Sequence, residues 1–399
     1  MTGLGLLGPA FVAAVAYVDP GNVAANLQAG ARYGYLLLWV LVAATAAAGL
    51  LQYLSAKLGI ATSQSLPELI RTRLRTPARV AYWLQAETVA MATDVAEVVG
   101  GAVALNLLFG LPLLFGGVLA AGASLLLLAV QDRRGQRTFE HLVIGLLLLI
   151  ALGFLAGLVV TPPAPAGVVG GLLPRFSGAD SMLLATAMFG ATVMPHVVYL
   201  HSALARDRFG TVPVGPRQRR LLAATRVDVV ISLMLAGGVN IAMLLLAAAA
   251  LPGREGVDTL EGAHRAITEQ VGPVIGVLFA IGLLLSSLAS TSVGCYAGSV
   301  VMQGLLRRSV GLFTRRVITV VPALIALALA SSPTQLLILS QVVLSFGLPF
   351  ALVPLVRLTS DRTLLGAAVN HRITTLLAWA VTVAITALNV VLIVAVVTG

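Results

Sequence analysis

Charged residues are scarce in this sequence. Only 10% of its 399 residues are Asp, Glu, Lys or Arg, and 59% are hydrophobic, whereas about a quarter of the residues in ordinary soluble domains are charged. Apolar runs of roughly 20 residues recur from one end to the other, and each is long enough to cross the hydrocarbon core of a bilayer as a helix. The composition leaves little room for a soluble domain and predicts an all-α, polytopic membrane protein with one transmembrane domain over residues 1–399.

The sequence has a single cysteine, and it lacks the common sequence motifs of enzymes. The single cysteine, Cys295, excludes an intrachain disulfide and a cysteine-based metal site. The first apolar run has no basic segment before it and no small-residue cleavage site after it, which indicates a mature span and not a signal peptide. His196 and His201 lack the spacing of a zinc-hydrolase motif, and there is no Ser-His-Asp cluster or glycine-rich phosphate loop. We therefore expect a protein that is not an enzyme.

The distribution of basic residues predicts the topology. Polar breaks divide the chain into eleven helices, at about 4–29, 33–56, 80–109, 112–130, 142–160, 180–204, 222–251, 270–304, 316–331, 334–356 and 373–398. If the N-terminus is cytoplasmic, the inner loops hold 21 of the 25 Lys and Arg residues, and the outer loops hold only Arg32, Arg175, Arg254 and Arg265. The positive-inside rule favours this arrangement, with the C-terminus outside. The net charge of +10 is then explained by topology, and no nucleic-acid partner is expected.

Two of these helices contain residues that break helices. The first holds Asp19-Pro20-Gly21-Asn22, and the sixth holds the run from Gly190 to His196, which includes Met194-Pro195. Proline removes a backbone donor and glycine permits non-helical dihedral angles, so backbone groups near each break lose their helical partners. Lipid cannot satisfy such groups, which are tolerated only where they face protein, water or a ligand.

The breaks lie five helices apart. Two five-helix halves have opposite topology when the first begins inside and the sixth begins outside, and paired broken helices in inverted halves indicate a transporter's site at the membrane midplane. We therefore expect inverted repeats at about 4–160 and 180–356, with an additional helix at about 373–398. Either proline alone could be an ordinary kink, and it is the matching positions that favour a site.

The side chains at the two breaks suggest a cation. Asp19 and Asn22 provide oxygen, the opened backbone near Ala16 and Ala191 provides carbonyls, and Met194 provides a thioether. Oxygen ligands alone suit calcium or magnesium, and a soft sulfur shifts the preference toward transition-metal ions. Taken alone, Met194 would be a flexible core residue; its position opposite the first break favours the role of a ligand.

The two motifs resemble the paired signatures of the Nramp family of divalent metal-ion/proton symporters. The resemblance extends to Thr93-Asp94-Val95-Ala96-Glu97 and to Leu339-Ser340-Gln341. It implies a LeuT-like inverted repeat that imports manganese or ferrous iron by alternating access, with cadmium, cobalt and zinc as surrogates, and no prosthetic group. It further implies that the ion is bound by Asp19, Asn22, Met194 and the Ala16 and Ala191 carbonyls, joined in some states by Gln341. Relatives that accept magnesium lack the methionine. We expect a monomer in a bacterial cytoplasmic membrane.

A stripe of carboxylates is the candidate proton route. Glu87, Asp94 and Glu97 fall within roughly 80° of one another on one helix. Charges in a membrane helix are costly, so such groups are protonated, wet or paired. The resemblance makes Asp94 and Glu97 part of a proton exit path from Asp19, with Arg316 as ionic partner. The alternatives are a structural pairing of these acids, above all of Glu87, and an ordinary positive-inside role for Arg316.

Histidine adds one further candidate. His196 follows Met194-Pro195 directly, and its ordinary pKa near 6.5 would let it respond to external pH. His201 lies about 140° away around the helix, so a shared chelate is not expected and a structural role is favoured.

Three rival functions remain open from the sequence. A sodium-coupled amino-acid or amine symporter could share the architecture but would have no need of Met194. A divalent-cation channel would have acids lining one pore, whereas here the acids lie on two particular helices. The third is an integral membrane enzyme, for which no motif is found.

Overall fold

The computed structural model describes residues 8–134, 154–252, 256–308 and 310–398, together with residues 145, 148, 149, 151 and 152. Within these residues the protein is helical and has no strand. Seven of the described helices are long and apolar enough to cross a membrane: Leu38–Thr62, Thr76–Phe109, Gly178–Phe209, Pro216–Ala250, Pro273–Leu306, Pro333–Thr359 and Arg372–Ala395. The protein is therefore an integral membrane protein, and the expected count of eleven spans stays a prediction.

The first predicted span is two short helices. Helix α1 covers Pro9–Ala16 and α2 covers Pro20–Tyr33. The unbroken helix α3 follows, over Leu38–Thr62. The sequence places the break at Asp19–Asn22, whereas in the structure Pro20 already lies in the first turn of α2 and the non-helical residues are 17–19. The shift is small and has a simple cause: proline fits the first turn of a helix, where its missing N–H is not needed.

The remaining part of the first half contains two long helices. Helix α5 covers Thr76–Phe109 and α6 covers Leu113–Arg134. Of the helix expected at 142–160, the structure describes residues 145, 148, 149, 151, 152 and 154–160, and all of these are helical. A short helix, α8, covers Pro165–Gly171 before the second half begins.

The second half opens with the other broken helix. Helix α9 covers Gly178–Val193 and α10 covers Pro195–Phe209, so only Met194 leaves the helical conformation. This break is narrower than the Gly190–His196 run that the sequence indicates. The longer helices that follow are α11 (Pro216–Ala250), α13 (Pro273–Leu306), α14 (Leu312–Leu329), α15 (Pro333–Thr359) and α17 (Arg372–Thr398).

Short helices connect several of these elements. They are α4 (Leu66–Arg73), α12 (Leu260–Gln270), α16 (Arg362–Leu365) and the 3-10 turn η2 (Gly366–Ala368). None was expected, because a search for apolar runs of membrane length cannot detect short polar helices in loops. Helix α4 is stabilised by a capping box. The Ser65 side chain accepts a hydrogen bond from the backbone N–H of Glu68, and the Glu68 carboxylate accepts one from the backbone N–H of Ser65.

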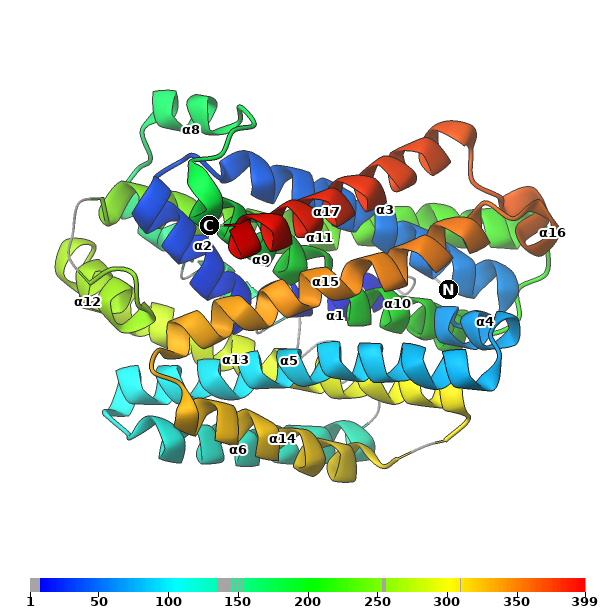
Figure 1. Ribbon diagram of the computed structural model, residues 1–399, viewed down its shortest axis with the longest axis horizontal. Coiled ribbons are helices and arrows are strands. Elements are labelled where there is room, and N and C mark those ends of the chain that lie inside the picture. Colours follow the sequence, from blue (N-terminus) through cyan, green and yellow to red (C-terminus); the bar gives the residue numbers. More distant parts are fainter. Residues whose placement is uncertain are drawn as a thin grey trace.

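The broken helices lie at the centre of the helix bundle. Helices α5, α6, α13 and α14 pack together along one side, and α3, α11 and α17 lie on the other (Figure 1). The most apolar stretch of Gly178–Phe209 is 89% buried inside the protein, whereas that of α17 is only 28% buried. An apolar helix that protein covers so completely is shielded from lipid, and α17 is peripheral.

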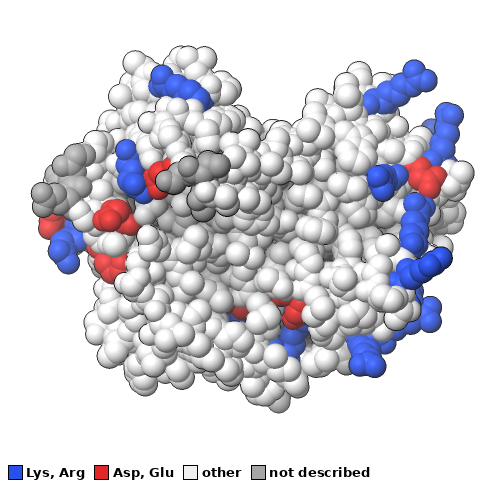
Figure 2. Space-filling view, viewed as in Figure 1, with Lys and Arg blue, Asp and Glu red and all other residues white. Residues whose placement is uncertain are grey.

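Charge is concentrated at the ends of the bundle. In Figure 2 the Lys and Arg side chains gather at the end where Figure 1 places α4 and α16, while acidic and basic side chains mix near α12 at the opposite end. The surface between the two ends is almost free of charge on the face shown. This pattern is typical of a protein whose uncharged belt lies in a bilayer.

Candidate functional site

The first break releases a carbonyl because of the position of a proline. In a continuous helix the carbonyl of Ala16 would accept from the N–H of residue 20, and residue 20 is Pro20, which has none. The last turn of α1 is tightened: the N–H groups of Tyr17 and Val18 donate to the carbonyls three residues earlier, those of Ala14 and Val15, at 3.0 and 3.1 Å. The Ala16 carbonyl is therefore free for another partner.

The second break follows the same rule. Ala191 lies four residues before Pro195, as Ala16 lies four residues before Pro20, so its carbonyl also lacks a helical donor. Met194 has φ 40° and ψ 105°, a conformation that is unusual for any residue other than glycine. The two other non-glycine residues with positive φ among those described, Ser63 and Arg307, only terminate helices. Met194 interrupts a helix in its middle, and such strain is typical of functional sites.

Side chains join the two breaks directly. The Asn22 side-chain amide donates to the Ala191 carbonyl at 2.8 Å and to Asp19 Oδ1 at 3.1 Å. The Asn22 backbone N–H donates to the same Asp19 oxygen at 2.7 Å, which caps α2. Gln341 of α15 donates from Nε2 to Asp19 Oδ2 at 3.2 Å. The first break and α15 therefore meet at the Asp19 carboxylate, and Asn22 links this carboxylate to the second break.

The site is closed to solvent and unbalanced in charge. Asp19, Asn22, Met194 and Gln341 are all 0% exposed. Within the described part of the chain no cationic side chain contacts Asp19, and Gln341 Oε1 is buried without a hydrogen-bond partner. A buried carboxylate without a compensating charge is costly. The arrangement therefore calls for a proton or a cation on Asp19.

The possible ligands form a mixed set. Carboxylate, amide and carbonyl oxygens converge on the breaks, and the thioether of Met194 belongs to the same segment. Among the described residues no three His, Cys, Asp or Glu side chains gather as a conventional metal cluster. A set with one charge, several neutral oxygens and one sulfur suits a cation that is bound and then released.

Close packing holds α15 against both breaks. A Cβ on Gly21 would lie 1.8 Å from the Gln341 side-chain nitrogen, and one on Gly190 would lie 2.0 Å from the Gln341 carbonyl oxygen. Both distances are far below van der Waals contact. These two glycines therefore let one residue, Gln341, touch the two broken helices.

Sequence reasoning missed the partners of two other released carbonyls. Asn240 of α11 donates from its side chain to the Tyr17 carbonyl at 2.7 Å, and the Ser286 hydroxyl of α13 donates to the Val18 carbonyl. Both side chains are buried. The available signal was a polar residue in the middle of an apolar helix, which in a membrane protein marks an interhelical contact.

His196 and His201 face different neighbours. His196 Nδ1 lies 3.5 Å from the Thr93 hydroxyl on α5, and its Nε2 is buried without a partner. His201 Nδ1 lies 2.7 Å from the Gln52 side-chain oxygen, and Gln52 in turn donates to the Tyr17 hydroxyl. The two imidazoles share no contact, in agreement with their angular separation on α10.

The three acids of α5, Glu87, Asp94 and Glu97, separate into two groups. Arg316 of α14, which is 1% exposed, donates from Nη1 to Asp94 at 2.5 Å and to Glu97 at 3.5 Å. Its remaining nitrogens donate to the hydroxyls of Ser124 and Thr291 at 3.0 and 3.3 Å. Asp94, Glu97 and Arg316 thus form one buried cluster, as the resemblance implies.

Glu87 belongs to a separate ion pair. Its carboxylate accepts from Arg315 at 2.7 Å, and both side chains are largely buried. The structure therefore pairs Glu87 with the neighbouring arginine, which matches the structural alternative considered for it. The pair carries no net charge, so nothing in its geometry requires a bound ion.

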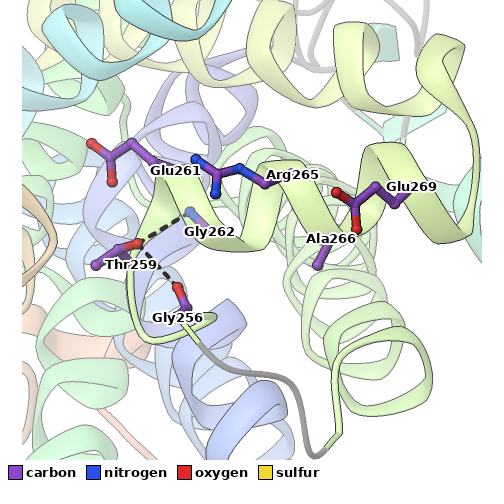
Figure 3. A pocket seen from close by; sticks show the side chains of 7 residues that line it. All are labelled: Gly256, Thr259, Glu261, Gly262, Arg265, Ala266 and Glu269. Carbon is purple, nitrogen blue, oxygen red and sulfur yellow. Dashed lines mark hydrogen bonds between the residues drawn. The ribbon is translucent and has the colours of Figure 1, made fainter.

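A surface hollow beside α12 is distinct from the breaks. It has a volume of about 460 Å³ and is lined by Gly256, Thr259, Glu261, Gly262, Arg265, Ala266 and Glu269 (Figure 3). The Thr259 hydroxyl accepts from the Gly262 N–H and caps α12. Arg265 lies between two acids on the same helix (Figure 3). A cationic side chain at this position disfavours a divalent ion there.

The chain matches proteins of known family along nearly its whole length. Residues 10–395 match the family model described as natural resistance-associated macrophage protein-like, Nramp. The divalent metal cation transporter MntH of Mycobacterium tuberculosis is 59% identical over 394 residues, which cover 99% of this chain and 92% of that protein. MntH of Deinococcus radiodurans is 47% identical over 388 residues, with coverage of 97% and 88%.

Solved structures agree in fold. The manganese transporter of Eremococcus coleocola, in complex with an aromatic bis-isothiourea compound, superposes with a TM-score of 0.88 at 30% identity, covering 98% of this chain and 86% of that one. MhsT in complex with L-phenylalanine has a TM-score of 0.66 at 14% identity and covers 98% of both chains, which shows a shared LeuT-like fold alone. With the broken helices in place and a family match over residues 10–395, the chain belongs to the Nramp family.

Proposed function

We propose that this protein is a secondary transporter that imports divalent transition-metal ions across a bacterial cytoplasmic membrane. Manganese and ferrous iron are the proposed substrates, with cadmium, cobalt and zinc as surrogates. The relatives from M. tuberculosis and D. radiodurans are named divalent metal cation transporters, and the E. coleocola protein is a manganese transporter. A transporter of this kind is not an enzyme and needs no prosthetic group.

One observation carries the proposal. The Asn22 amide spans the two broken helices, with Asp19 on one side and the Ala191 carbonyl on the other. A cation between them would replace the amide protons, because Asn22 can turn its oxygen toward the ion. The proposed ligands are Asp19, Asn22, Met194, the Ala16 and Ala191 carbonyls and, in some states, Gln341.

Met194 is the proposed basis of selectivity. Magnesium binds hard oxygen ligands in a near-octahedral shell and dehydrates reluctantly, whereas manganese and iron accept a softer donor. The side chain is completely buried at a strained backbone position, so it cannot swing away into solvent. A sulfur held at the site therefore disfavours magnesium and calcium.

Proton transport is the second part of the proposal. Protonated Asp19 attracts a divalent cation much less than ionised Asp19 does, so the two cargoes are linked at one carboxylate. We place the proton route from Asp19 past His196 to the Asp94–Glu97–Arg316 cluster. His196 is suited to this position because it is buried between the break and Thr93 of α5, with one ring nitrogen unpartnered among the described residues.

Alternating access is the proposed mechanism. The eleven spans would form inverted repeats at about 4–160 and 180–356, followed by a peripheral helix at about 373–398, in a monomer with the N-terminus inside and the C-terminus outside. The repeated Ala-x-x-x-Pro spacing at the breaks and the peripheral position of α17 support this organisation. Rocking of one bundle would open the buried site to one side at a time.

Transport by proteoliposomes tests the proposal. Uptake of manganese, with internal pH followed at the same time, would be measured for the wild type, Asp19→Ala and Met194→Ala. We expect Asp19→Ala to abolish uptake and acidification, and Met194→Ala to admit calcium or magnesium. Asp258→Ala, at an exposed residue, and Met188→Ala, at a buried methionine of α9, are the matched controls.

Three outcomes would contradict the proposal. Full manganese uptake by Asp19→Ala would remove the site assignment, and unchanged rejection of magnesium and calcium by Met194→Ala would remove the role of sulfur. Sodium-dependent uptake of an amino acid or amine, without uptake of manganese, would favour the rival symporter.

A further inference from the structure

We propose that a cavity between the α15–α17 connection and the start of α17 binds the phosphate headgroup of an anionic phospholipid. The cavity has a volume of about 590 Å³ and is lined by Ser360, Arg362, Val369, Asn370, Arg372, Thr375, Leu376 and Trp379. It lies on the peripheral helix, away from the broken helices. The inference does not depend on which substrate the protein carries.

The cavity has an excess of positive charge. Arg362 and Arg372 are exposed, and within the described residues neither has an ion-pair partner. The neighbouring acid, Asp361, is already engaged by Arg73 at 2.9 Å and by the Thr363 hydroxyl at 2.6 Å. Two guanidinium groups therefore face the cavity without a counter-ion, and guanidinium is the side chain best suited to phosphate.

A third positive charge lies behind the cavity wall. Lys57 of α3 is only 4% exposed, and its ammonium donates to the side-chain oxygen of Asn370, one of the lining residues. Lys57 has no carboxylate partner in the described part of the chain. An anion in the cavity would offset this buried charge as well as the two arginines.

The polar wall is already in place. Asn370 is fixed by its backbone N–H and its side-chain amide, which donate to the Thr359 carbonyl and hydroxyl at 3.0 and 2.9 Å. The hydroxyls of Ser360 and Thr375 lie 3.1 Å apart. These hydroxyls can donate to phosphate oxygens without a rearrangement of the loop, so little ordering is needed on binding.

Apolar residues of α17 favour a lipid over free phosphate. Leu376, which lines the cavity, is 69% exposed, and Ile373, one turn earlier on the same helix but outside the lining, is 62% exposed. Trp379, half-buried, also lines the cavity, and tryptophan is enriched at the level of the headgroups. A ligand with a phosphate and attached acyl chains would contact both the polar and the apolar residues, whereas inorganic phosphate would contact only the polar ones.

The location fits the inner leaflet. Helix α16 carries Arg362 and lies at the end of the bundle where basic side chains gather (Figures 1 and 2). By the positive-inside rule this end is cytoplasmic. Basic pockets on that side of membrane proteins recognise anionic headgroups.

Native mass spectrometry of the purified protein tests the inference. Phosphatidylglycerol or phosphatidylcholine would be titrated against the wild type, R362Q/R372Q and the control R219Q/R220Q, which removes two exposed arginines that do not line the cavity. Each basic residue near a membrane surface changes affinity for an anionic lipid about fivefold. We expect R362Q/R372Q to weaken phosphatidylglycerol binding about 30-fold, with little change in the control or for phosphatidylcholine.

Three results would overturn the inference. Equal losses of phosphatidylglycerol affinity in R362Q/R372Q and R219Q/R220Q would mean that the lipid is attracted by overall charge and not by this cavity. Equal affinity of the wild type for phosphatidylglycerol and phosphatidylcholine would mean that the charge of the lipid is not recognised. Complete competition by millimolar inorganic phosphate would assign the cavity to a free anion. Thermal unfolding of R362Q/R372Q, measured in the same detergent, checks that the variant is folded.

Discussion

Arg316 holds together the most highly charged buried cluster described in the protein, and its removal has a calculable cost. The guanidinium is 1% exposed and contacts the carboxylates of Asp94 and Glu97 as well as the hydroxyls of Ser124 and Thr291. Arg316→Gln keeps a polar side chain but leaves two buried carboxylates without a cation. Such a change breaks a buried ion pair from one side.

The expected loss of stability in Arg316→Gln is large. Removing one partner of a buried ion pair typically lowers the free energy of unfolding by about 3–5 kcal/mol, because the remaining charge is uncompensated. A second variant, Asp94→Asn with Glu97→Gln and Arg316→Gln, removes all three charges. It should be more stable than Arg316→Gln alone, and the difference measures the cost of the stranded carboxylates.

Denaturant titration in mild detergent, followed by tryptophan fluorescence, measures these differences. Arg357→Gln is the control, because Arg357 is exposed and surface substitutions change stability by about 0.5 kcal/mol or less. The reasoning is refuted if Arg316→Gln loses less than about 1 kcal/mol, or if the triple variant is no more stable than the single one. Either result would mean that water or structural relaxation compensates the acids.

Three further predictions concern packing and pH. Asn240→Ala should lower the free energy of unfolding by about 1–3 kcal/mol in the same titration, because a buried carbonyl at the first break loses its donor. Gly190→Ala places a Cβ 2.0 Å from a main-chain oxygen of α15 and should reduce both stability and uptake, whereas Gly122→Ala, with no atom within 4 Å, should leave both intact. Burial raises the pKa of Glu68, but hydrogen bonds from the backbone at the start of α4 and from Arg206 outweigh it, so the pKa is lowered. Its stabilising contribution is therefore present above its unfolded pKa, near 4.3, and is lost as pH falls through the folded pKa. Glu68→Gln should consequently weaken the dependence of the melting temperature on pH as the pH falls below about 4.3, and an unchanged acid profile would contradict the assignment.

The broken helices were predictable because their cause is local. Pro20 and Pro195 remove specific backbone donors, and counting four residues back identifies Ala16 and Ala191 as the carbonyls that lose them. The exact width of the second break was not predictable. Residues 190–193 remain helical and only Met194 does not. Helix α15 packs closely against Gly190, and this tertiary contact cannot be read from the local sequence.

The side chains that donate hydrogen bonds to the carbonyls at the first break were not predictable in the same way. Asn240 and Ser286 lie more than 200 residues from the carbonyls that they satisfy, and nothing local in the sequence identifies the pairing. The short helices α4 and α12 were missed because their stability comes from end caps, at Ser65 and Thr259, and not from long apolar runs. Arg316 was found by resemblance, and the sequence alone could not choose between its partners and those of Arg315.

The central claim is that both breaks contribute ligands to one transported ion. X-ray absorption at the manganese edge of the purified protein tests it most directly, with wild type and Met194→Leu compared at equal occupancy and with the manganese affinity of Asp19→Asn measured beside that of the wild type. We expect one sulfur neighbour together with oxygen neighbours in the wild type, loss of the sulfur alone in Met194→Leu, and greatly weakened binding in Asp19→Asn. An oxygen-only spectrum in the wild type, or tight binding that survives Asp19→Asn, would contradict it.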